Sequence, residues 1–125
     1  MLEVTELQVR IGALMPVRSL SFSLGRGETL GLIGESGSGK SLAALALMGL
    51  LPEGISASGI IRLEGQDLLA LDEPAWCRLR GRRIAMIFQE PMTALNPLHP
   101  ILRQVAEPLR LHLGLSAAAA ATEAA

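Results

Sequence analysis

The chain contains one glycine-rich stretch that constrains its fold more than any other part of the sequence. It reads Gly34-Glu35-Ser36-Gly37-Ser38-Gly39-Lys40-Ser41, with four residues between the first and last glycine, followed by a lysine and a hydroxyl residue. The mostly apolar residues 28–33 before it are typical of a short buried strand, and residues 42–48 after it are typical of a helix. The stretch is therefore predicted to form a tight turn between a strand and a helix.

A turn of this kind has the chemistry of a phosphate-binding loop. Its glycines lack a Cβ, so the backbone can curl and turn its N–H groups toward an anion. The start of the next helix adds more N–H groups and a partial positive charge. Lys40 is predicted to reach the outer phosphates of a nucleotide, and the Ser41 hydroxyl is predicted to bind Mg²⁺. Lys40 is the only lysine among 11 basic residues, which favours a specific role for its slim ammonium group.

Composition limits the classes of protein that the chain can represent. Its 125 residues make one domain at most, small for a phosphate-loop fold, and hydrophobic residues make up 50% of it. The net charge of −1 provides no general electrostatic attraction for nucleic acid, so nucleic acid is not expected as a partner. Its single cysteine, together with the lack of a signal-peptide pattern or a long apolar run, predicts a cytoplasmic protein.

The remaining elements are predicted from hydrophobic periodicity and turn signals. Strands are predicted over residues 2–9 (with an alternation broken once), 17–24, 58–65 and, as a central parallel strand, 84–88. Helices are predicted from residue 72 to near residue 81, over residues 101–113 and over residues 117–125. Gly12 and Pro16 are predicted to mark a turn, and Pro108 is predicted to kink or restart its helix.

Residues 68–73 have two interpretations. Four apolar residues precede Asp72 and Glu73, as at the end of a Walker B strand, where Asp72 would hold Mg²⁺ and Glu73 would polarise water. A helix N-terminus with Asp72 as its cap is the other interpretation. We favour it because the preceding strand ends at Gly65, too close for the chain to cross the sheet again. A compact P-loop kinase or GTPase that uses Asp72 or Glu73 is the alternative.

Residues 86–97 strongly resemble the Q-loop of ABC-transporter ATPases. They read Met86-Ile87-Phe88-Gln89-Glu90-Pro91-Met92-Thr93-Ala94-Leu95-Asn96-Pro97. With residues 31–41 and 81–86, they are similar to the oligopeptide, dipeptide and nickel importer branch of that family, and the resemblance runs from about Leu2 to Ser116. It implies an α/β fold, a P-loop NTPase (ABC ATPase) core with an antiparallel β subdomain, truncated after the Q-loop region.

The resemblance also implies a function for the complete domain. It would bind ATP and Mg²⁺ and couple ATP hydrolysis to the uptake of peptides or a related solute such as nickel. Gln89 would contact Mg²⁺ and sense the γ-phosphate and its water, for which a side-chain amide is suited because it both donates and accepts. The segment bounded by Met92 and Pro100 would receive the transmembrane subunits, at the inner face of the membrane. A second ATPase domain, in a homo- or heterodimer, would complete the site.

The sequence departs from the family pattern in two ways. The family usually places an aromatic residue just past the first strand to stack on adenine, whereas Val9-Arg10-Ile11 stand here, and Arg10 is the substitute that we consider. The Leu-Ser-Gly-Gly-Gln signature, the Walker B strand and the switch histidine are absent from residues 1–125, which are predicted to be a partial nucleotide-binding domain. Such a domain is expected to leave apolar sheet edges open. The alternative is a non-catalytic remnant that binds nucleotide weakly.

Overall fold

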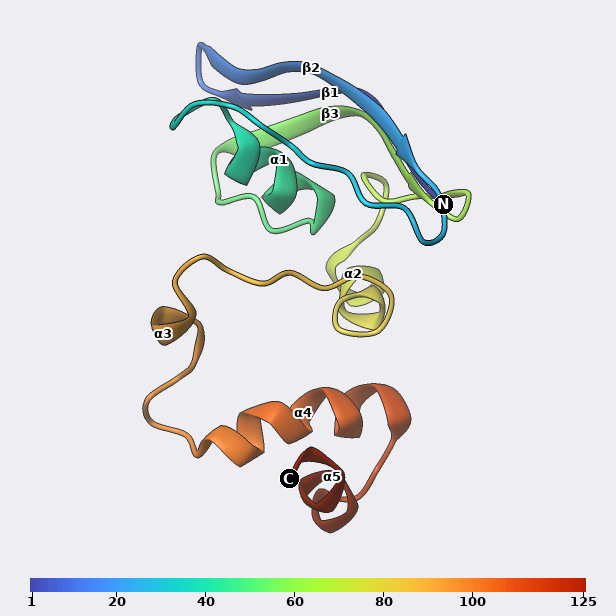
Figure 1. Cartoon of the computed structure of the whole chain (residues 1–125), viewed down its shortest axis with the longest axis vertical. Coiled ribbons are helices and arrows are strands. Elements are labelled where there is room, and N and C mark those ends of the chain that lie inside the picture. The colour runs from blue at the N-terminus through green and yellow to red at the C-terminus, as the bar shows by residue number, and fades with distance from the viewer. The chain divides into compact units, whose positions relative to one another are not determined.

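The structure is a computed structural model, and it describes residues 1–125 with the exception of the side chain of Pro91. The chain divides into two compact units, Met1–Trp76 and Cys77–Ala125. The first unit contains β1 (Leu2–Ile11), β2 (Leu14–Leu24), α1 (Lys40–Leu47), β3 (Ile55–Leu63) and β4 (Gln66–Asp67). Helix α2 (Glu73–Leu79) crosses the boundary, and the second unit contains α3 (Pro91–Ala94), α4 (Ile101–Leu113) and α5 (Ala117–Ala124) (Figure 1).

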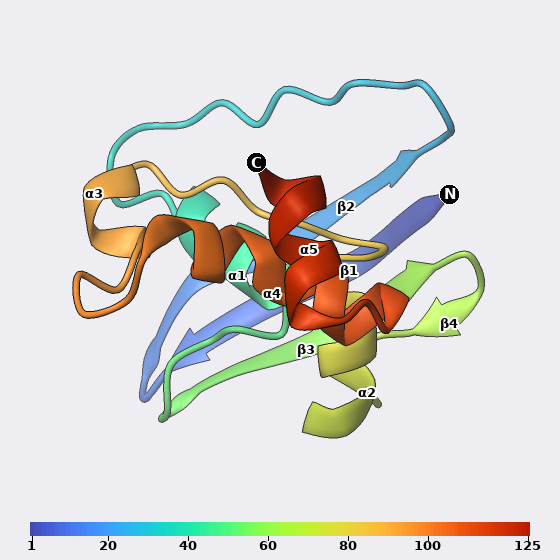
Figure 2. The same cartoon turned by 90° about the horizontal axis from the view of Figure 1, so that it is seen from below.

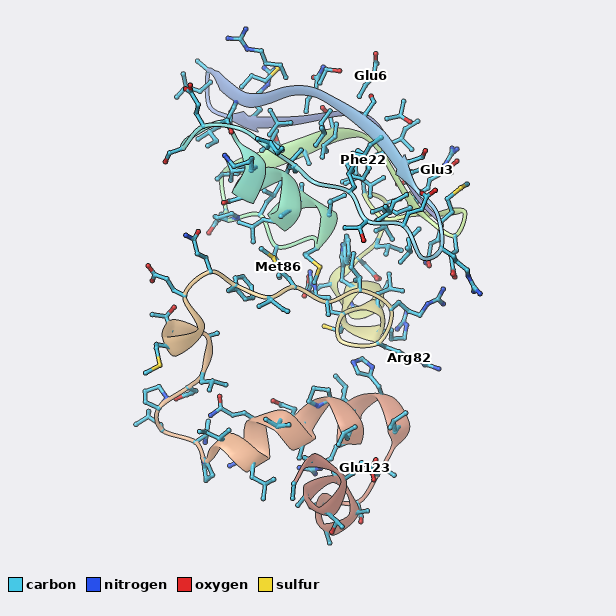
Figure 3. The ribbon with its side chains drawn as sticks, viewed as in Figure 1. Glu3, Glu6, Phe22, Arg82, Met86 and Glu123 are labelled. Carbon is cyan, nitrogen blue, oxygen red and sulfur yellow. The ribbon has the colours of Figure 1, made fainter. Side chains whose placement is uncertain are left out.

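The first unit is an antiparallel sheet with one helix packed against it. The strand order is β2-β1-β3-β4, and β4 is a short return from the end of β3 (Figure 2). Apolar side chains that alternate along the strands, among them Val4, Val9 and Ile61, are buried. Phe22 lies on the sheet face toward α1, and Glu6 points away from the opposite face (Figure 3). The predicted strands in the first unit over residues 2–9, 17–24 and 58–65 are confirmed, apart from their ends.

The predicted break in the alternation of β1 is a bulge at Glu6. This residue has a φ of 48°, and both strand registers shift around it. Its backbone N–H donates to the Ser21 hydroxyl at 2.8 Å instead of to a ladder carbonyl. On the other side of β1, a Cβ at Gly59 would lie 2.5 Å from the Glu6 carbonyl oxygen, and Gly59 has a φ of +106°. The bulge therefore needs glycine at position 59.

The turn predicted at Gly12 is confirmed, whereas the turn signal read from Pro16 is wrong. Gly12 has a φ of 56° in the link between β1 and β2. Pro16 lies inside β2, which is an edge strand of the sheet. An edge position tolerates proline because one row of its backbone groups has no ladder partner to lose.

Two predicted strands are not hydrogen-bonded strands. Residues 28–33 have no ladder partner within the described part of the chain, and Ile33 is 97% exposed. In residues 84–88 only Ile84 forms a bridge, to Arg80, and Ile87 is 98% exposed. Both predictions depended on apolar composition, but a strand also needs a neighbour that accepts its backbone hydrogen bonds. Ile33 and Ile87 are therefore exposed apolar side chains on segments outside the sheet.

The Asp72 helix-cap interpretation is confirmed, and the Walker B interpretation is wrong. The Asp72 Oδ1 atom accepts a hydrogen bond of 3.0 Å from the backbone N–H of Ala75, and α2 begins at Glu73. Residues 68–71 form a turn after β4 rather than a strand. The Asp72 carboxylate is therefore committed to the start of α2.

The other helices largely follow their predictions. Helix α1 is confirmed, although only its Ala43 and Ala46 are buried, so the expectation that it is covered on nearly all sides is wrong. Helix α4 passes through Pro108 without a break and ends before Gly114, which has a φ of 66°. Ser116 caps α5 by accepting from the Ala119 N–H at 3.2 Å. No helix that the structure describes is long and apolar enough to cross a membrane.

Candidate functional site

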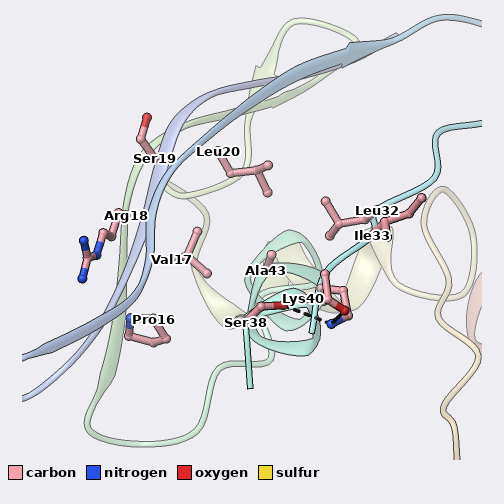
Figure 4. Close-up of a pocket in the computed structure, with 12 residues that line it drawn as sticks. Pro16, Val17, Arg18, Ser19, Leu20, Leu32, Ile33, Ser38, Lys40 and Ala43 are labelled. Atoms are coloured by element: carbon pink, nitrogen blue, oxygen red, sulfur yellow. Dashed lines mark hydrogen bonds between the residues drawn. The ribbon is translucent and has the colours of Figure 1, made fainter. Parts of the chain in front are cut away.

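The glycine-rich stretch forms a loop that folds around the side chain of Lys40. The Lys40 ammonium donates to the carbonyl oxygens of Gly34 and Glu35, at 2.5 and 2.6 Å. It also donates to the Ser38 hydroxyl at 3.0 Å (Figure 4). The Ser38 N–H donates to the Glu35 oxygen at 3.1 Å and closes the turn. The loop therefore holds a positive charge directly at the start of α1.

Glycine is required at two points of this loop, and at the second of them for two reasons. Gly37 and Gly39 have φ values of 80° and 86°, a region that other residues rarely adopt. A Cβ at Gly39 would also lie 2.8 Å from both the Pro16 carbonyl oxygen and the Val17 Cγ2 atom. Strand β2 thus packs directly on the last turn of the loop.

The start of α1 leaves hydrogen-bond donors free. Gly39 is the N-cap residue and supplies no side-chain cap, so the first N–H groups of the helix, those of Lys40 and Ser41, have no intrahelical acceptor. The Ser41 side chain is exposed, and its hydroxyl makes no hydrogen bond within the described residues. Uncapped N–H groups beside a lysine form an anion site, and a free serine hydroxyl can contribute an oxygen ligand to Mg²⁺.

A hollow of about 220 Å³ lies beside the loop. Its walls come from the loop, from the start of α1, from β2 and from residues 32–33. Val17 points toward the loop, whereas the Arg18 guanidinium points away from it (Figure 4). The alternation of residues 17–24 predicts that Val17 is buried, but no sequence signal identified β2 as a wall of the site.

The Ser41 hydroxyl is the oxygen donor that the loop offers to the predicted Mg²⁺. No group of three His, Cys, Asp or Glu residues that could hold a metal ion exists among the described residues. A Mg²⁺ ion at a phosphate loop needs no such group, because it keeps several waters and takes oxygen ligands from substrate phosphates. Ser41 fits this ligand type.

Gln89 belongs to the second unit. Its exposed side chain lines a hollow of about 420 Å³ with Phe88, Glu90, Thr93 and Ala94. The Thr93 hydroxyl donates to the Glu90 carbonyl oxygen at 2.9 Å, which supports the short helix α3. Met92 within α3 and Leu98 beyond it, both in the predicted docking segment, are 90% and 86% exposed.

These features define a nucleotide-binding domain of the P-loop class, with an antiparallel β subdomain. The sequence model of the ABC transporter family matches residues 17–124. The chain therefore belongs to the ABC transporter family.

Several curated proteins are similar to the chain. It is 46% identical to the oligopeptide transport ATP-binding protein OppD of Salmonella typhimurium, over 98% of this chain and 38% of that protein. It is 43% identical to the OppD protein of Mycobacterium tuberculosis, over 90% of this chain and 19% of that protein. The glutathione import ATP-binding protein GsiA of Shigella flexneri is 48% identical, over 86% of this chain and 18% of its own length. The chain thus spans well under half the length of these relatives.

Proposed function

We propose that the chain binds Mg-ATP through residues 34–41 and forms nucleotide-binding machinery of an ABC importer. The observation that carries the proposal is the uncapped start of α1 with the Lys40 ammonium inside the loop. Phosphate oxygens would accept from the free N–H groups and from Lys40, and Ser41 would contribute an oxygen to Mg²⁺. Gln89 would be the second protein ligand of Mg²⁺ and the sensor of the γ-phosphate, as the family resemblance implies.

The remaining parts of the proposal concern the whole protein. The similar proteins carry names for oligopeptide transport and glutathione import, which supports uptake of peptides or a related solute, with nickel as the other candidate. Residues 92–100 would dock onto transmembrane subunits, and the exposed Met92 and Leu98 suit an apolar contact. A second ATPase domain would complete the site, and the protein would act in the cytoplasm on the inner face of the membrane.

A second candidate function is nucleotide binding without turnover. The Asp72 carboxylate caps α2, so the aspartate of the acidic pair that could have served hydrolysis is used structurally. We expect the 125-residue chain to bind Mg-ATP and release no phosphate by itself. Calorimetric titration and a phosphate-release assay on one preparation check both statements, and phosphate release that survives in Lys40→Ala would point to a contaminating enzyme.

Ser41→Ala tests the magnesium site. The variant loses the proposed oxygen ligand of Mg²⁺, so its affinity for ATP in Mg²⁺ is expected to fall by roughly ten- to a hundredfold. Its affinity for ATP in excess EDTA should equal that of the wild-type chain. Ser19→Ala is the matched control, because Ser19 lines the same hollow and points away from the loop (Figure 4). Equal calorimetric affinities of Ser41→Ala and wild type in Mg²⁺ would remove Ser41 from the metal site.

Ile11→Tyr tests how the base is held. Ile11 ends β1, pairs with Leu14 and Ile55, and is 37% exposed. Its side chain is aliphatic, so it offers no ring on which adenine could stack. An aromatic ring there is expected to raise the affinity for Mg-ATP by about two- to tenfold and to leave inorganic triphosphate binding unchanged. An equal gain for inorganic triphosphate would mean that the ring does not contact the base.

A further inference from the structure

Gln104 ties together the loop that precedes α4. Its Oε1 atom accepts a hydrogen bond of 2.8 Å from the Asn96 backbone N–H. Its Nε2 atom donates to the carbonyl oxygens of Asn96 and His99, both at 2.9 Å. We name this arrangement of Asn96, His99 and Gln104 the Gln104 clamp. A single side chain from the first turn of α4 therefore holds both ends of residues 96–99.

The loop is also closed by bonds of its own. The Asn96 Oδ1 atom accepts from the Leu98 N–H at 2.9 Å, and the His99 N–H donates to the Asn96 carbonyl oxygen at 3.2 Å. The Pro100 carbonyl oxygen accepts from the Arg103 N–H at 3.1 Å and so begins α4. With the Gln104 clamp, these bonds give the backbone between α3 and α4 a defined shape before any partner is bound.

The chemistry of the clamp requires glutamine. Only a side-chain amide provides an acceptor for one N–H and two donors for two carbonyl oxygens. Glutamate has nearly the same shape, but its carboxylate would face the carbonyl oxygens of Asn96 and His99 without a proton to donate. Asparagine is shorter by one methylene group. Gln104 is half-buried, so these contacts are partly withdrawn from solvent.

The clamp lies among exposed apolar side chains. Leu98 lies inside the clamped loop and is 86% exposed, and the flanking Leu95 and Ile101 are 43% and 64% exposed. Adjacent exposed apolar residues mark an interaction surface, and a surface ordered in advance loses less conformational entropy when a partner binds. The clamp therefore orders the backbone that presents these side chains.

We propose that Gln104 is the positioning residue of the docking surface for transmembrane subunits. Its side chain holds the backbone of residues 96–99 in one conformation before docking, and the apolar partner binds this preformed loop. This inference rests on the proposed function of residues 92–100. It assigns a role to the Asn96-Pro97 part of the Q-loop resemblance, which nucleotide binding alone leaves without one.

Amide hydrogen exchange tests the clamp in the free chain. In Gln104→Ala the Asn96 N–H loses its acceptor, and its exchange is expected to be at least about tenfold faster than in the wild type. Gln104→Glu should also make exchange at Asn96 faster, because the variant loses both donors of the clamp while it keeps the side-chain volume. Glu107→Ala, an exposed position on the same helix, is the control and should leave exchange at Asn96 unchanged. Wild-type exchange at Asn96 in both Gln104 variants would overturn the proposal.

Docking is then measured with the full chain and the detergent-solubilised transmembrane part of the oligopeptide transport system of Salmonella typhimurium, immobilised on a sensor surface. Gln104→Ala and Gln104→Glu are both expected to weaken docking by about tenfold and to leave the Mg-ATP affinity unchanged. If the Gln104 side chain only filled space, Gln104→Glu would instead dock as tightly as the wild-type chain. Faster exchange with unchanged docking would overturn the positioning role alone. Failure of the wild-type chain to dock, with the exchange result as expected, would instead contradict the proposed docking function of residues 92–100.

Discussion

Lys40→Ala is expected to abolish measurable Mg-ATP binding, with a Kd at least about a hundredfold higher than that of the wild-type chain. The Lys40 ammonium lies inside the loop, where it contacts the Gly34 and Glu35 oxygens at 2.5 and 2.6 Å. Phosphate oxygens that replace these neutral acceptors would form charge-assisted hydrogen bonds, which contribute roughly 1.5–3 kcal/mol each. Isothermal titration calorimetry with Mg-ATP measures the change.

Two further variants separate the position of Lys40 from its charge. Arg18→Ala removes a positive charge that lines the same hollow but points away from the loop, and its Kd should equal that of the wild type (Figure 4). Lys40→Arg keeps the charge but replaces a compact ammonium by a planar guanidinium, and it should also bind poorly. Unchanged titration in Lys40→Ala would refute the proposed phosphate site. Comparable losses in Arg18→Ala and Lys40→Ala would reduce the effect to general electrostatic attraction.

Local chemistry made most of the fold predictable from the sequence. Asp72 before a helical pattern predicted a cap, and its carboxylate accepts from the Ala75 N–H. Likewise, the alternation of residues 2–9 is broken once in the sequence, and β1 carries a bulge at Glu6. The predicted strands over 28–33 and 84–88 do not form, apart from the single bridge between Ile84 and Arg80. Strand formation depends on a neighbouring strand, and apolar composition carries no information about a neighbour. Ile33 and Ile87 lie almost fully exposed as a result.

In the candidate site, too, features set by neighbouring residues could be predicted from the sequence, whereas contacts between distant residues could not. The spacing of residues 34–41 predicted the turn, and the position of Lys40 inside it follows from the loop geometry. The contact of Gly39 with Pro16 and Val17 joins segments more than 20 residues apart in the sequence, so periodicity could not predict it. The Gln104 clamp was also missed, because an isolated glutamine on a helix has no pattern that distinguishes it from a solvated one.

Gly49→Ala is expected to lower the free energy of unfolding of the first unit by about 2–5 kcal/mol, because two costs add. Gly49 follows α1 with a φ of +61°, and an L-residue in this region costs roughly 1–2 kcal/mol. A Cβ there would also lie 2.3–2.7 Å from three ring atoms of Trp76, a side chain that is only 6% exposed. Moving this ring or α1 adds an overpacking cost of about 1–3 kcal/mol. Urea unfolding followed by the fluorescence of Trp76, the single tryptophan, measures the loss.

Gly54→Ala is the control that isolates the crowding at Gly49. Gly54 also has a left-handed φ, +82°, but nothing lies within 4 Å of the position that its Cβ would take. Its free energy of unfolding should therefore fall only by the backbone cost of roughly 1–2 kcal/mol. If the two variants unfold at the same urea concentration, the contact between Gly49 and Trp76 adds nothing to stability. A larger loss in Gly49→Ala would show that Trp76 packs on the end of α1 too closely to admit a Cβ at position 49.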